Sequence, residues 1–401
     1  MSSSLTQWLM THYGREEVKK DTGLSRIQTA LASIHPALSQ KKIITIAGTN
    51  GKGETTLWLS RFLEKRSHCT WISPHVERIT ERFRSEKGEI SFPELETLVH
   101  ECHALVLENK FSLSYYEFLF FVFCHWANKR NPDFLLLEVG LGGRLDAVNI
   151  FDADLILLPS LSRDHQEFLG NRYDLILKEK LGLLRQGSVF LHFLSLDYLK
   201  EKTSEIAKSI GAKNIDLDSL KLAGKWEFSV RNQLLARAAF LHITGTSVEK
   251  LPEELKSFRP GAHFLEYRGE SISSRGEWIF YGSHNVDGMR NLIQFLQCGN
   301  YNFSRPPYDL VLVAFSRRDE NDLRTMLKML RGSGLGNILV TSFPHPKAMD
   351  PGVMEKLAGQ EGIKFVHDVE ACIQNSENGS RTLVTGSYYF MGHLRQLIRS
   401  R

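Results

Sequence analysis

A glycine-rich segment near the start of the chain, GTNGKGETT (residues 48–56), constrains the fold more than any other feature of the sequence. It follows a short β-branched run, IITIA (43–47), and leads into TTLWLSRFLEKR (55–66), whose apolar residues recur at helical spacing. A glycine loop between a strand and a helix directs backbone N–H groups and a helix N-terminus at phosphate oxygens, and Lys52 can reach the β- and γ-phosphates. The segment therefore predicts a phosphate loop, and the alternative is a glycine turn with a solvated lysine.

Later apolar runs place this loop in an α/β domain. FLLLEVG (134–140) and ADLILLPSL (153–161) are almost continuously apolar, which is typical of strands in a parallel sheet that is covered on both faces. Tyr115–Trp126 is apolar nearly all round and long enough for a buried helix. The alternation of strands and helices predicts a mostly parallel sheet.

A second α/β pattern begins near residue 276. Its expected strands are WIFYG (278–282), DLVLVAF (309–315), NILVTSF (337–343), KFVHD (364–368) and RTLVTGS (381–387), and its helices include DLRTMLKMLRG and YYFMGHLRQLI. The stretch before it carries Pro260-Gly261 and several charges without periodicity, as a linker does. Since 401 residues are long for one core, we expect domains over 1–260 and 276–401, joined by a linker over 261–275.

Composition narrows the class of partner and the compartment. The net charge of +4 is small, and Lys and Arg are scattered rather than gathered into the stripe that nucleic acid needs. The five cysteines are odd in number and form no C-x-x-C, which argues against disulfides or zinc and favours a reducing cytoplasm. The first 20 residues show no basic segment followed by an apolar stretch, and no run of about 18 apolar residues occurs later, so we expect neither a signal peptide nor a membrane span. We expect a cytoplasmic monomer that binds small molecules, without nucleic acid or membrane.

Several polar residues follow predicted strands and are candidates for chemistry. Glu138 ends a buried strand, at the edge where open α/β sheets bind ligands, and its carboxylate either holds magnesium or accepts hydrogen bonds from neighbouring N–H groups. His165 follows the next strand, and a lone histidine is more often a hydrogen-bonded structural residue than a ligand. By its own sequence context Lys180 would be a surface lysine. His284 and Asn285 either close over a nucleotide or form a polar turn.

Five segments together resemble one family, the folylpolyglutamate synthase and dihydrofolate synthase branch of the Mur ligase superfamily. They are GTNGKG, SPHVERITERFR (73–84), LEVGLGGRLDAVN (137–149), DHQEFLG (164–170) and EKLGLLR (179–185). The resemblance extends from GLSRI (23–27) to TGSYYFMGHLR (385–395). It implies an α/β protein with an N-terminal P-loop ATPase-type domain and a smaller, C-terminal Rossmann-like domain that binds glutamate.

The resemblance also implies a reaction and its cofactors. ATP, with Mg²⁺, phosphorylates the carboxylate of dihydropteroate or a reduced folate, and the amino group of L-glutamate attacks the acyl phosphate. Amide, ADP and phosphate are the products. The protein would be an ATP-dependent C–N ligase.

Site residues carry over by position. The expected catalytic residues are Lys52, Glu138, His165 and Lys180. The expected nucleotide contacts are Thr49, Asn50, Gly51, Lys52, Gly53, Glu54, Thr55, Asn232 and His284. The expected magnesium ligands are Ser73, Glu138, His165 and Lys180, the last as a carbamate. The folate-type acid is expected at Ser114, Tyr116, Gly143, Arg144 and Asp146, with Glu117 beside them.

Three departures from the family pattern concern the ATP side. Glu54 replaces a usual serine and brings a negative charge beside the triphosphate, unless it points away or pairs with a cation. Ala262 replaces an arginine, and Tyr281 replaces an aspartate. These departures prompt one alternative, a non-catalytic ATP- or folate-binding paralogue. Another is a related ligase that acts on a different acid.

Overall fold

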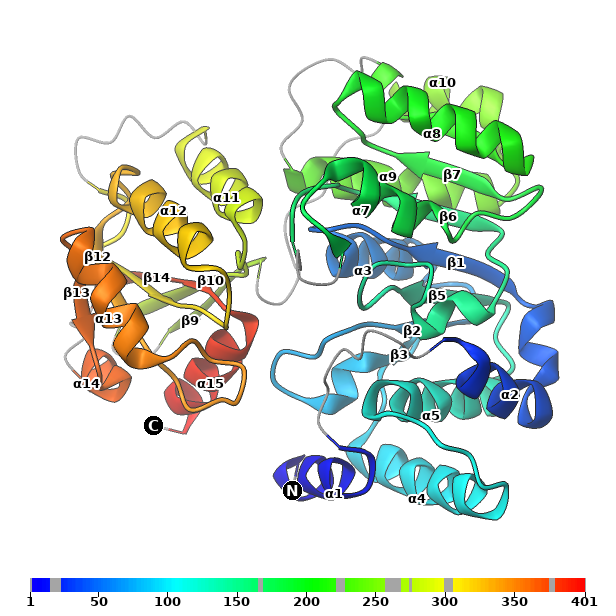
Figure 1. Ribbon diagram of the computed structural model, residues 1–401, viewed down its shortest axis with the longest axis horizontal. Helices are drawn as coiled ribbons and strands as arrows, with labels where there is room; N and C mark the ends of the chain where they lie inside the picture. Colours follow the sequence, from blue (N-terminus) through cyan, green and yellow to red (C-terminus); the bar gives the residue numbers. More distant parts are fainter. Residues whose placement is uncertain are drawn as a thin grey trace. The chain divides into compact units, whose positions relative to one another are not determined.

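The computed structural model describes residues 2–14, 23–164, 169–220, 228–256, 268–273, 276–298, 306–374 and 379–400. The chain divides into two compact units, Met1–Pro260 and Gly261–Arg401, and each is an α/β structure built on its own sheet (Figure 1). The two-part α/β fold predicted from the sequence is confirmed.

The sheet of the first unit has eight strands in the order β4-β3-β2-β5-β1-β6-β7-β8. Their bounds are β1 (Lys42–Ile46), β2 (His68–Trp71), β3 (Phe83–Ser85), β4 (Gly88–Glu89), β5 (Phe134–Glu138), β6 (Leu155–Leu158), β7 (Val189–His192) and β8 (Lys213–Asp216). All neighbours are parallel except the β2–β3 and β3–β4 pairs. Ile46 at the end of β1 lies opposite Glu138 of β5 and Leu157 of β6, so the segments after these three strands leave the same edge.

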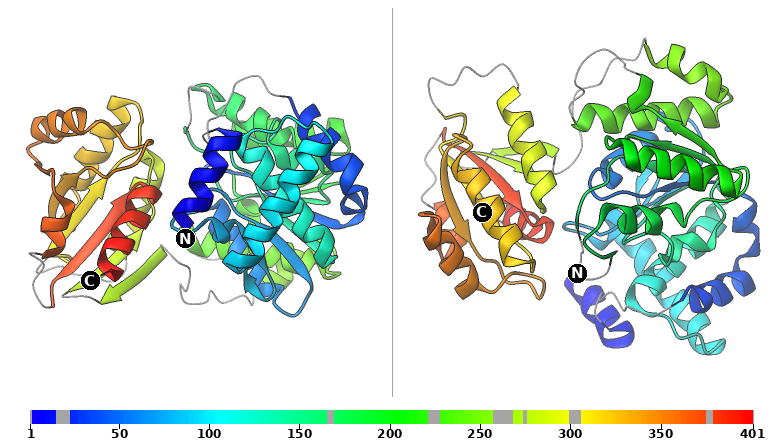
Figure 2. Two further views of the ribbon diagram at one scale, coloured as in Figure 1. Left: turned by 90° about the horizontal axis from the view of Figure 1, so that it is seen from below. Right: turned by 45° about the horizontal axis from the view of Figure 1, so that its top comes forward.

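Helices cover both faces of this sheet (Figures 1 and 2). They are α1 (Ser2–Tyr13), α2 (Ser25–Ile34), α3 (Lys52–Phe62), α4 (Phe92–Glu108), α5 (Tyr115–Arg130), α7 (Tyr173–Leu181), α8 (Asp197–Ile210), α9 (Phe228–Ile243) and α10 (Leu251–Lys256). Short 3₁₀ turns are η1 (Pro36–Gln40), η2 (Ile79–Arg82), η3 (Ala147–Ile150), η4 (Asp218–Leu220) and η5 (Val248–Lys250). Two helix pairs matter below: α4 packs beside α5, and α3 beside α9.

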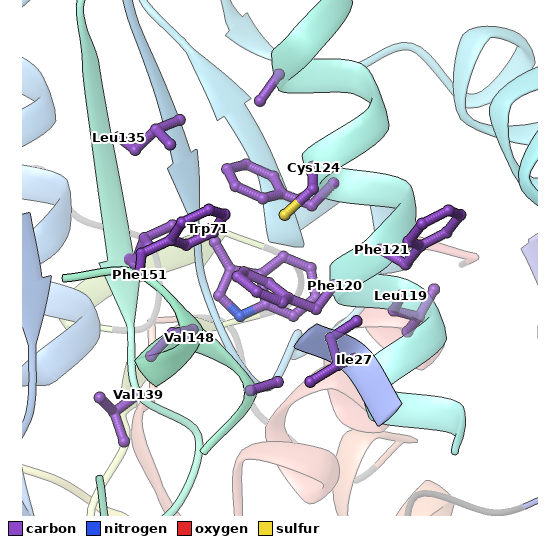
Figure 3. Close-up of a cluster of buried hydrophobic side chains, with 14 of the residues drawn as sticks. Ile27, Trp71, Leu119, Phe120, Phe121, Cys124, Leu135, Val139, Val148 and Phe151 are labelled. Carbon is purple, nitrogen blue, oxygen red and sulfur yellow. The ribbon is translucent and has the colours of Figure 1, made fainter. Parts of the chain in front are cut away.

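The core of the first unit is centred on α5, which is apolar all round because it is covered on every side. Figure 3 shows Phe120 and Cys124 of this helix together with Trp71 of β2 and Phe151. The Trp71 and Phe120 rings lie edge to face at 5.5 Å between centroids, a favoured geometry for aromatic pairs. This packing fixes α5 against β2.

The second unit has a six-stranded sheet in the order β13-β12-β11-β14-β10-β9. Its strands are β9 (Arg268–Ser273), β10 (Glu277–Tyr281), β11 (Leu310–Ala314), β12 (Asn337–Thr341), β13 (Lys364–Val366) and β14 (Arg381–Gly386). Its helices are α11 (Val286–Cys298), α12 (Glu320–Arg331), α13 (Pro351–Gln360), α14 (Val369–Gln374) and α15 (Tyr388–Arg399). All strands are parallel except β9, which runs antiparallel to β10.

Part of the predicted linker is wrong. Residues 268–273, expected between the domains, form β9 at the edge of the second sheet and pair with β10 from Arg268 opposite Tyr281 to Ser273 opposite Glu277. The segment RGESIS is polar because an edge strand is paired on one side only, and it therefore lacks the apolar pattern of an internal strand. Most of the remaining linker lies outside the described residues. No helix in the described parts of the chain is long and apolar enough to span a membrane.

Candidate active site

The segment between β1 and α3 has the form of a phosphate loop. Gly51 precedes the first turn of α3 with φ at 85°, a left-handed conformation that favours glycine. The loop is held by the segment after β6, because Thr49 N donates to Ser160 O at 3.1 Å and Asn50 N to Ser160 Oγ at 2.9 Å. Thr49 Oγ1 also donates to Ser162 O at 2.9 Å. The sequence analysis did not single out these two serines, although Ser160 lies at the end of the predicted strand over 153–161 and Ser162 directly follows it.

Two lysines meet at the start of this loop. Lys52 Nζ donates to Gly48 O and Thr49 O, each at 3.2 Å, and Lys180 Nζ donates to Gly48 O at 3.1 Å. Lys180 is 3% exposed, so the alternative of a solvated surface lysine is wrong. Burial, and next the charge of Lys52, lower the pKa of Lys180 to about 7, against the opposing effect of Asp164. A substantial fraction of this amine is therefore neutral near neutral pH.

Glu138 and Ser73 lie together beside the first turn of α3. Glu138 is buried at the end of β5, and Ser73 N donates to its Oε2 at 3.2 Å. A Cβ on Gly53 would lie 3.5 Å from Oε2, so glycine brings the backbone of α3 close to the carboxylate. Ser73 Oγ is buried and, although it approaches the Tyr116 hydroxyl, makes no hydrogen bond of normal geometry. Hydroxyl and carboxylate oxygens are ligands that Mg²⁺ prefers, so this pair fits the metal.

The other two expected magnesium ligands are His165 and Lys180. His165 lies outside the described residues, and the described ranges contain no group of three or more His, Cys, Asp or Glu that could hold a metal ion. As an amine, Lys180 offers magnesium no anionic oxygen. The described part of the site therefore supplies Ser73 and Glu138.

Asp146 organises the glycine-rich segment that follows β5. Its carboxylate accepts hydrogen bonds from Gly140 N at 2.9 Å, Leu141 N at 3.0 Å and Val148 N at 3.1 Å. It also accepts the Tyr116 hydroxyl at 3.1 Å. Burial raises the pKa of Asp146, and burial also raises the pKa of Tyr116 well above its ordinary range. Asp146 and the Tyr116 hydroxyl therefore hold the segment in shape.

The same segment packs on the turn of α7 that carries Lys180. A Cβ on Gly143 would lie 2.8 Å from Glu179 O and 3.2 Å from Lys180 Cα, so only glycine allows this approach without displacing the helix. Arg144 N donates to Glu179 O at 2.8 Å, and its guanidinium pairs with the Glu179 carboxylate at 3.1 Å while staying half exposed. Gly143 thus helps to position Lys180.

The Ser114 side chain caps the N-terminus of α5. Its Oγ accepts a hydrogen bond from Glu117 N at 3.4 Å, and Ser114 N donates to Glu117 Oε2 at 2.8 Å, which is a reciprocal capping box. Glu117 Oε2 also accepts a hydrogen bond from Arg26 at 2.8 Å. These bonds give the Ser114 side chain a structural role at the helix start.

Glu54, the departure from the family pattern, points toward α9. Its carboxylate is 3% exposed; Oε1 accepts the Ser229 hydroxyl, and Oε2 accepts Asn232 Nδ2 at 2.7 Å. Asn232, expected to approach the nucleotide, is fully buried, and its amide lies against Gly51. Thr55, which follows Glu54 in the sequence, is also fully buried. The charge of Glu54 is thus engaged by hydrogen-bond donors of α9.

In the second unit, His284 and Asn285 follow β10. Asn285 is fully buried and its Oδ1 accepts a hydrogen bond from Gly288 N at 2.8 Å, so it caps the start of α11 as a polar turn residue does. The His284 ring lies 5.4 Å from the Tyr388 ring, centroid to centroid. A Cβ on Gly282 would clash with Tyr388, so this turn and the start of α15 are in close contact.

These features define a class of protein. A phosphate loop at the carboxyl edge of a parallel sheet, two lysines on one loop carbonyl and a carboxylate with a buried hydroxyl beside it are the features expected of a metal-assisted phosphoryl-transfer site. No family model matches the chain. A curated relative does: the dihydrofolate synthase/folylpolyglutamate synthase of Escherichia coli K12 is 33% identical over 427 residues, which cover 100% of this chain and 97% of the relative. The chain belongs to the dihydrofolate synthase/folylpolyglutamate synthase family.

Solved structures of this kind share the fold. A folylpolyglutamate synthase of Mycobacterium tuberculosis, complexed with ADP and AMPPCP, matches with a TM-score of 0.82 at 19% identity over 99% of this chain and 98% of its own. A bifunctional folylpolyglutamate synthase/dihydrofolate synthase with Mn, AMPPNP and L-glutamate bound matches with a TM-score of 0.76 at 23% identity, covering 98% of each chain. Membership of this family confirms the expected ATP-dependent ligase, and the solved structures confirm the expected fold.

Proposed function

We propose that this ligase phosphorylates the carboxylate of dihydropteroate or a reduced folate and then joins it to L-glutamate, with the described edge of the first sheet as the phosphoryl-transfer site. One observation carries the proposal: Lys52 and Lys180 converge on Gly48 O, at the loop that follows β1. Two amines at one phosphate loop, with Glu138 beside its helix, suit a reaction that brings two anions together.

In the first step a carboxylate oxygen of the acid attacks the γ-phosphorus of ATP, and ADP leaves. Lys52 and the N–H groups at the start of α3 stabilise the charge of the transferring phosphoryl group. Ser73 and Glu138 would hold Mg²⁺, whose chemistry here is to neutralise and orient phosphate oxygens. In the second step the amino group of glutamate attacks the acyl carbon, phosphate leaves, and the nitrogen loses a proton.

Lys180 is proposed to act as a carbamate. Carbon dioxide adds to a neutral amine, and a pKa lowered to about 7 by burial makes that form available. The new N–C bond forms as the nitrogen loses a proton to solvent, so the product is an anionic oxygen donor that suits a hard cation, whereas the ammonium is not a ligand. Gly143 supports this role by bringing the segment after β5 against the backbone of Lys180.

The acid substrate is proposed to bind along the segment after β5 and the start of α5. The Tyr116 ring can stack on a pterin, because its hydroxyl is directed to Asp146. Arg144 is half exposed and can exchange Glu179 for a substrate carboxylate. We further propose that the first unit binds ATP and the acid, the second binds glutamate, and the protein acts as a cytoplasmic monomer.

The burial of Glu54 against α9 weakens one of the three reasons for a non-catalytic paralogue, since its carboxylate accepts hydrogen bonds from donors of α9. The test is an assay of purified protein with ATP, Mg²⁺ and glutamate, in which dihydropteroate and tetrahydrofolate are offered in turn and the products are resolved by mass. A mass increase by one glutamate on dihydropteroate, or by several on tetrahydrofolate, identifies the reaction. Absence of both products, with ATP bound normally, would contradict the proposal.

A further inference from the structure

Glu54 and Asn232 form a buried pair at the nucleotide loop. Glu54 is in the first turn of α3, and Asn232 is one turn into α9. Negative charge is favoured at a helix N-terminus, and here the carboxylate faces the first turns of two helices, since Ser229 and Asn232 of α9 both donate to it. This arrangement explains how a carboxylate can be buried so close to a phosphate loop.

The pair fixes which way the Asn232 amide faces. Both carboxylate oxygens of Glu54 act as acceptors: Oε1 accepts the Ser229 hydroxyl, and Oε2 accepts the NH₂ group of Asn232 at 2.7 Å. The amide oxygen is then directed elsewhere. Asn232 Oδ1 is buried and has no hydrogen-bond partner, which is costly for a polar atom unless a ligand supplies a donor.

The unpaired oxygen lies at the phosphate loop itself. A Cβ on Gly51 would be 2.7 Å from Asn232 Oδ1, so the amide rests directly on the glycine that precedes α3. Phosphate oxygens are acceptors and cannot satisfy an amide oxygen. The donors that ATP offers are the 6-amino group of adenine and the hydroxyls of ribose.

We infer that Glu54 is a positioning residue of the nucleotide site, because it holds the Asn232 amide with Oδ1 presented as an acceptor for a base amino or ribose hydroxyl donor of ATP. The inference rests on the proposed ATP site and adds a determinant of nucleotide selectivity to it. With serine at position 54, as is usual in this family, no carboxylate would fix the amide, and either face could be presented.

The first test needs no variant. Equilibrium dialysis of the full-length protein with Mg²⁺, but without acid substrate, gives Kd values for ATP, ITP, 2′-deoxy-ATP and 3′-deoxy-ATP. ITP lacks the 6-amino donor, and each deoxy analogue lacks one hydroxyl. We expect at least one analogue to bind about tenfold more weakly than ATP, as the loss of one buried hydrogen bond predicts, and that analogue identifies the donor. Equal affinity for all four nucleotides would overturn the inference.

The second test exchanges the pair. In Glu54→Gln the partner can donate as well as accept, so the amide is free to turn and the discrimination should fall several-fold. Asn232→Asp alone sets two carboxylates against each other and should weaken ATP binding most. In the double variant Glu54→Gln/Asn232→Asp the hydrogen bond is restored with its donor reversed, and the second Asp oxygen again faces the loop as an acceptor. We expect the double variant to regain most of the discrimination.

The matched control is Glu64→Gln, which removes one negative charge from an exposed position just beyond α3. Thermal unfolding midpoints are measured for every variant. A double variant that recovers its unfolding midpoint but not its selectivity would show that the pair only ties α3 to α9, and the inference would fail. If the parent protein binds no nucleotide at all, it is the proposed ATP site that fails.

Discussion

Lys52 and Lys180 share one acceptor: their Nζ atoms donate to the Gly48 carbonyl oxygen at 3.2 and 3.1 Å. The two residues are 128 positions apart and come from the first turn of α3 and the last turn of α7. Two ammonium groups so close repel each other, and in a buried setting the less exposed one gives up its proton more readily. Burial, and next the charge of Lys52, lower the pKa of Lys180 to about 7, so Lys180 is available as a neutral amine at this carbonyl.

Replacing Lys52 with alanine should abolish ligation while leaving the fold intact, because the side chain contacts loop carbonyls rather than the core. Loss of a charge of this kind from a transition state costs roughly 3 kcal/mol, or about a hundredfold in rate. Initial rates at saturating ATP test this, with Lys65→Ala at an exposed position as the control. Near-normal turnover by folded Lys52→Ala protein would remove the loop from the chemistry.

Glu138→Gln should raise the Mg²⁺ concentration needed for half-maximal activity and lower the maximal rate, because the amide keeps the shape but loses the charge of a metal ligand. Ser73→Ala should act in the same direction with a smaller effect, since it removes a neutral donor. His165→Ala is expected to follow Glu138→Gln. Magnesium titrations measure the effect, and exposed Glu108→Gln is the control. Titration curves that superimpose on the parent curve would contradict the metal site.

Two different substitutions of Tyr116 distinguish the role of its hydroxyl from the role of its ring. Tyr116→Phe keeps the ring but removes the hydroxyl bonded to Asp146, so it should loosen the segment after β5 and cost about 1 kcal/mol of stability. Tyr116→Ala also removes the ring and should raise the KM for the acid several-fold more than the KM for ATP. Arg144→Ala should share only the second effect. Equal changes in both KM values would place these residues outside the acid pocket.

Lys180→Ala should be nearly inactive and partly rescued by acetate, which can occupy the place of the carbamate. In the parent protein, carbon-13 NMR after bicarbonate labelling should show a carbamate signal. Because the pKa of Lys180 is lowered to about 7, the neutral amine and hence the signal should grow as the pH rises through 7, well below the range in which a free lysine reacts. Absence of the signal from active protein, with no acetate effect, would leave Lys180 as an uncharged hydrogen-bond donor.

His35 should make the first unit sensitive to acid. It is 5% exposed, and burial, then the neighbouring His125, lower its pKa to about 4. The folded state keeps the ring neutral while the unfolded chain takes up a proton near pH 6.5, so stability is complete above pH 6.5 and falls as the pH drops toward 4. Between pH 7 and pH 5 the loss should be about 1–2 kcal/mol. Urea denaturation at both pH values should show a smaller loss in His35→Gln than in the parent or in exposed His367→Gln; an unchanged loss in His35→Gln would assign the sensitivity elsewhere.

The long apolar strands of both sheets could be predicted from the sequence because burial on two faces leaves a continuous signal, as in β1, β5 and β11. Short strands gave no such signal. β3 and β4 contain three and two residues, and β9 is a polar edge strand. The positions of these strands depend on the strands that pair with them, and the local sequence pattern carries no information about those partners.

The residues of the candidate site also differ in whether the local sequence could predict them. Lys52 and Glu138 could be found from glycine loops that follow apolar strands. The burial of Lys180 could not, because it depends on the segment after β5 packing on α7, a contact between parts of the chain far apart in sequence. Likewise, the direction of Glu54 depends on α9, which begins 174 residues later. Resemblance to a family located these residues, but only the tertiary contacts give their environments.

The four hydrogen bonds that converge on Asp146 have a consequence for the thermodynamics of substrate binding. A glycine-rich segment left free in solution would lose conformational entropy when a ligand ordered it, on the order of 1 kcal/mol or more for each residue fixed. Here the donors from Gly140, Leu141, Val148 and Tyr116 already hold the segment before any ligand arrives. At the proposed acid pocket, this segment is therefore already ordered when the protein has folded, and a ligand bound there would not lose affinity to a disorder-to-order transition of the segment.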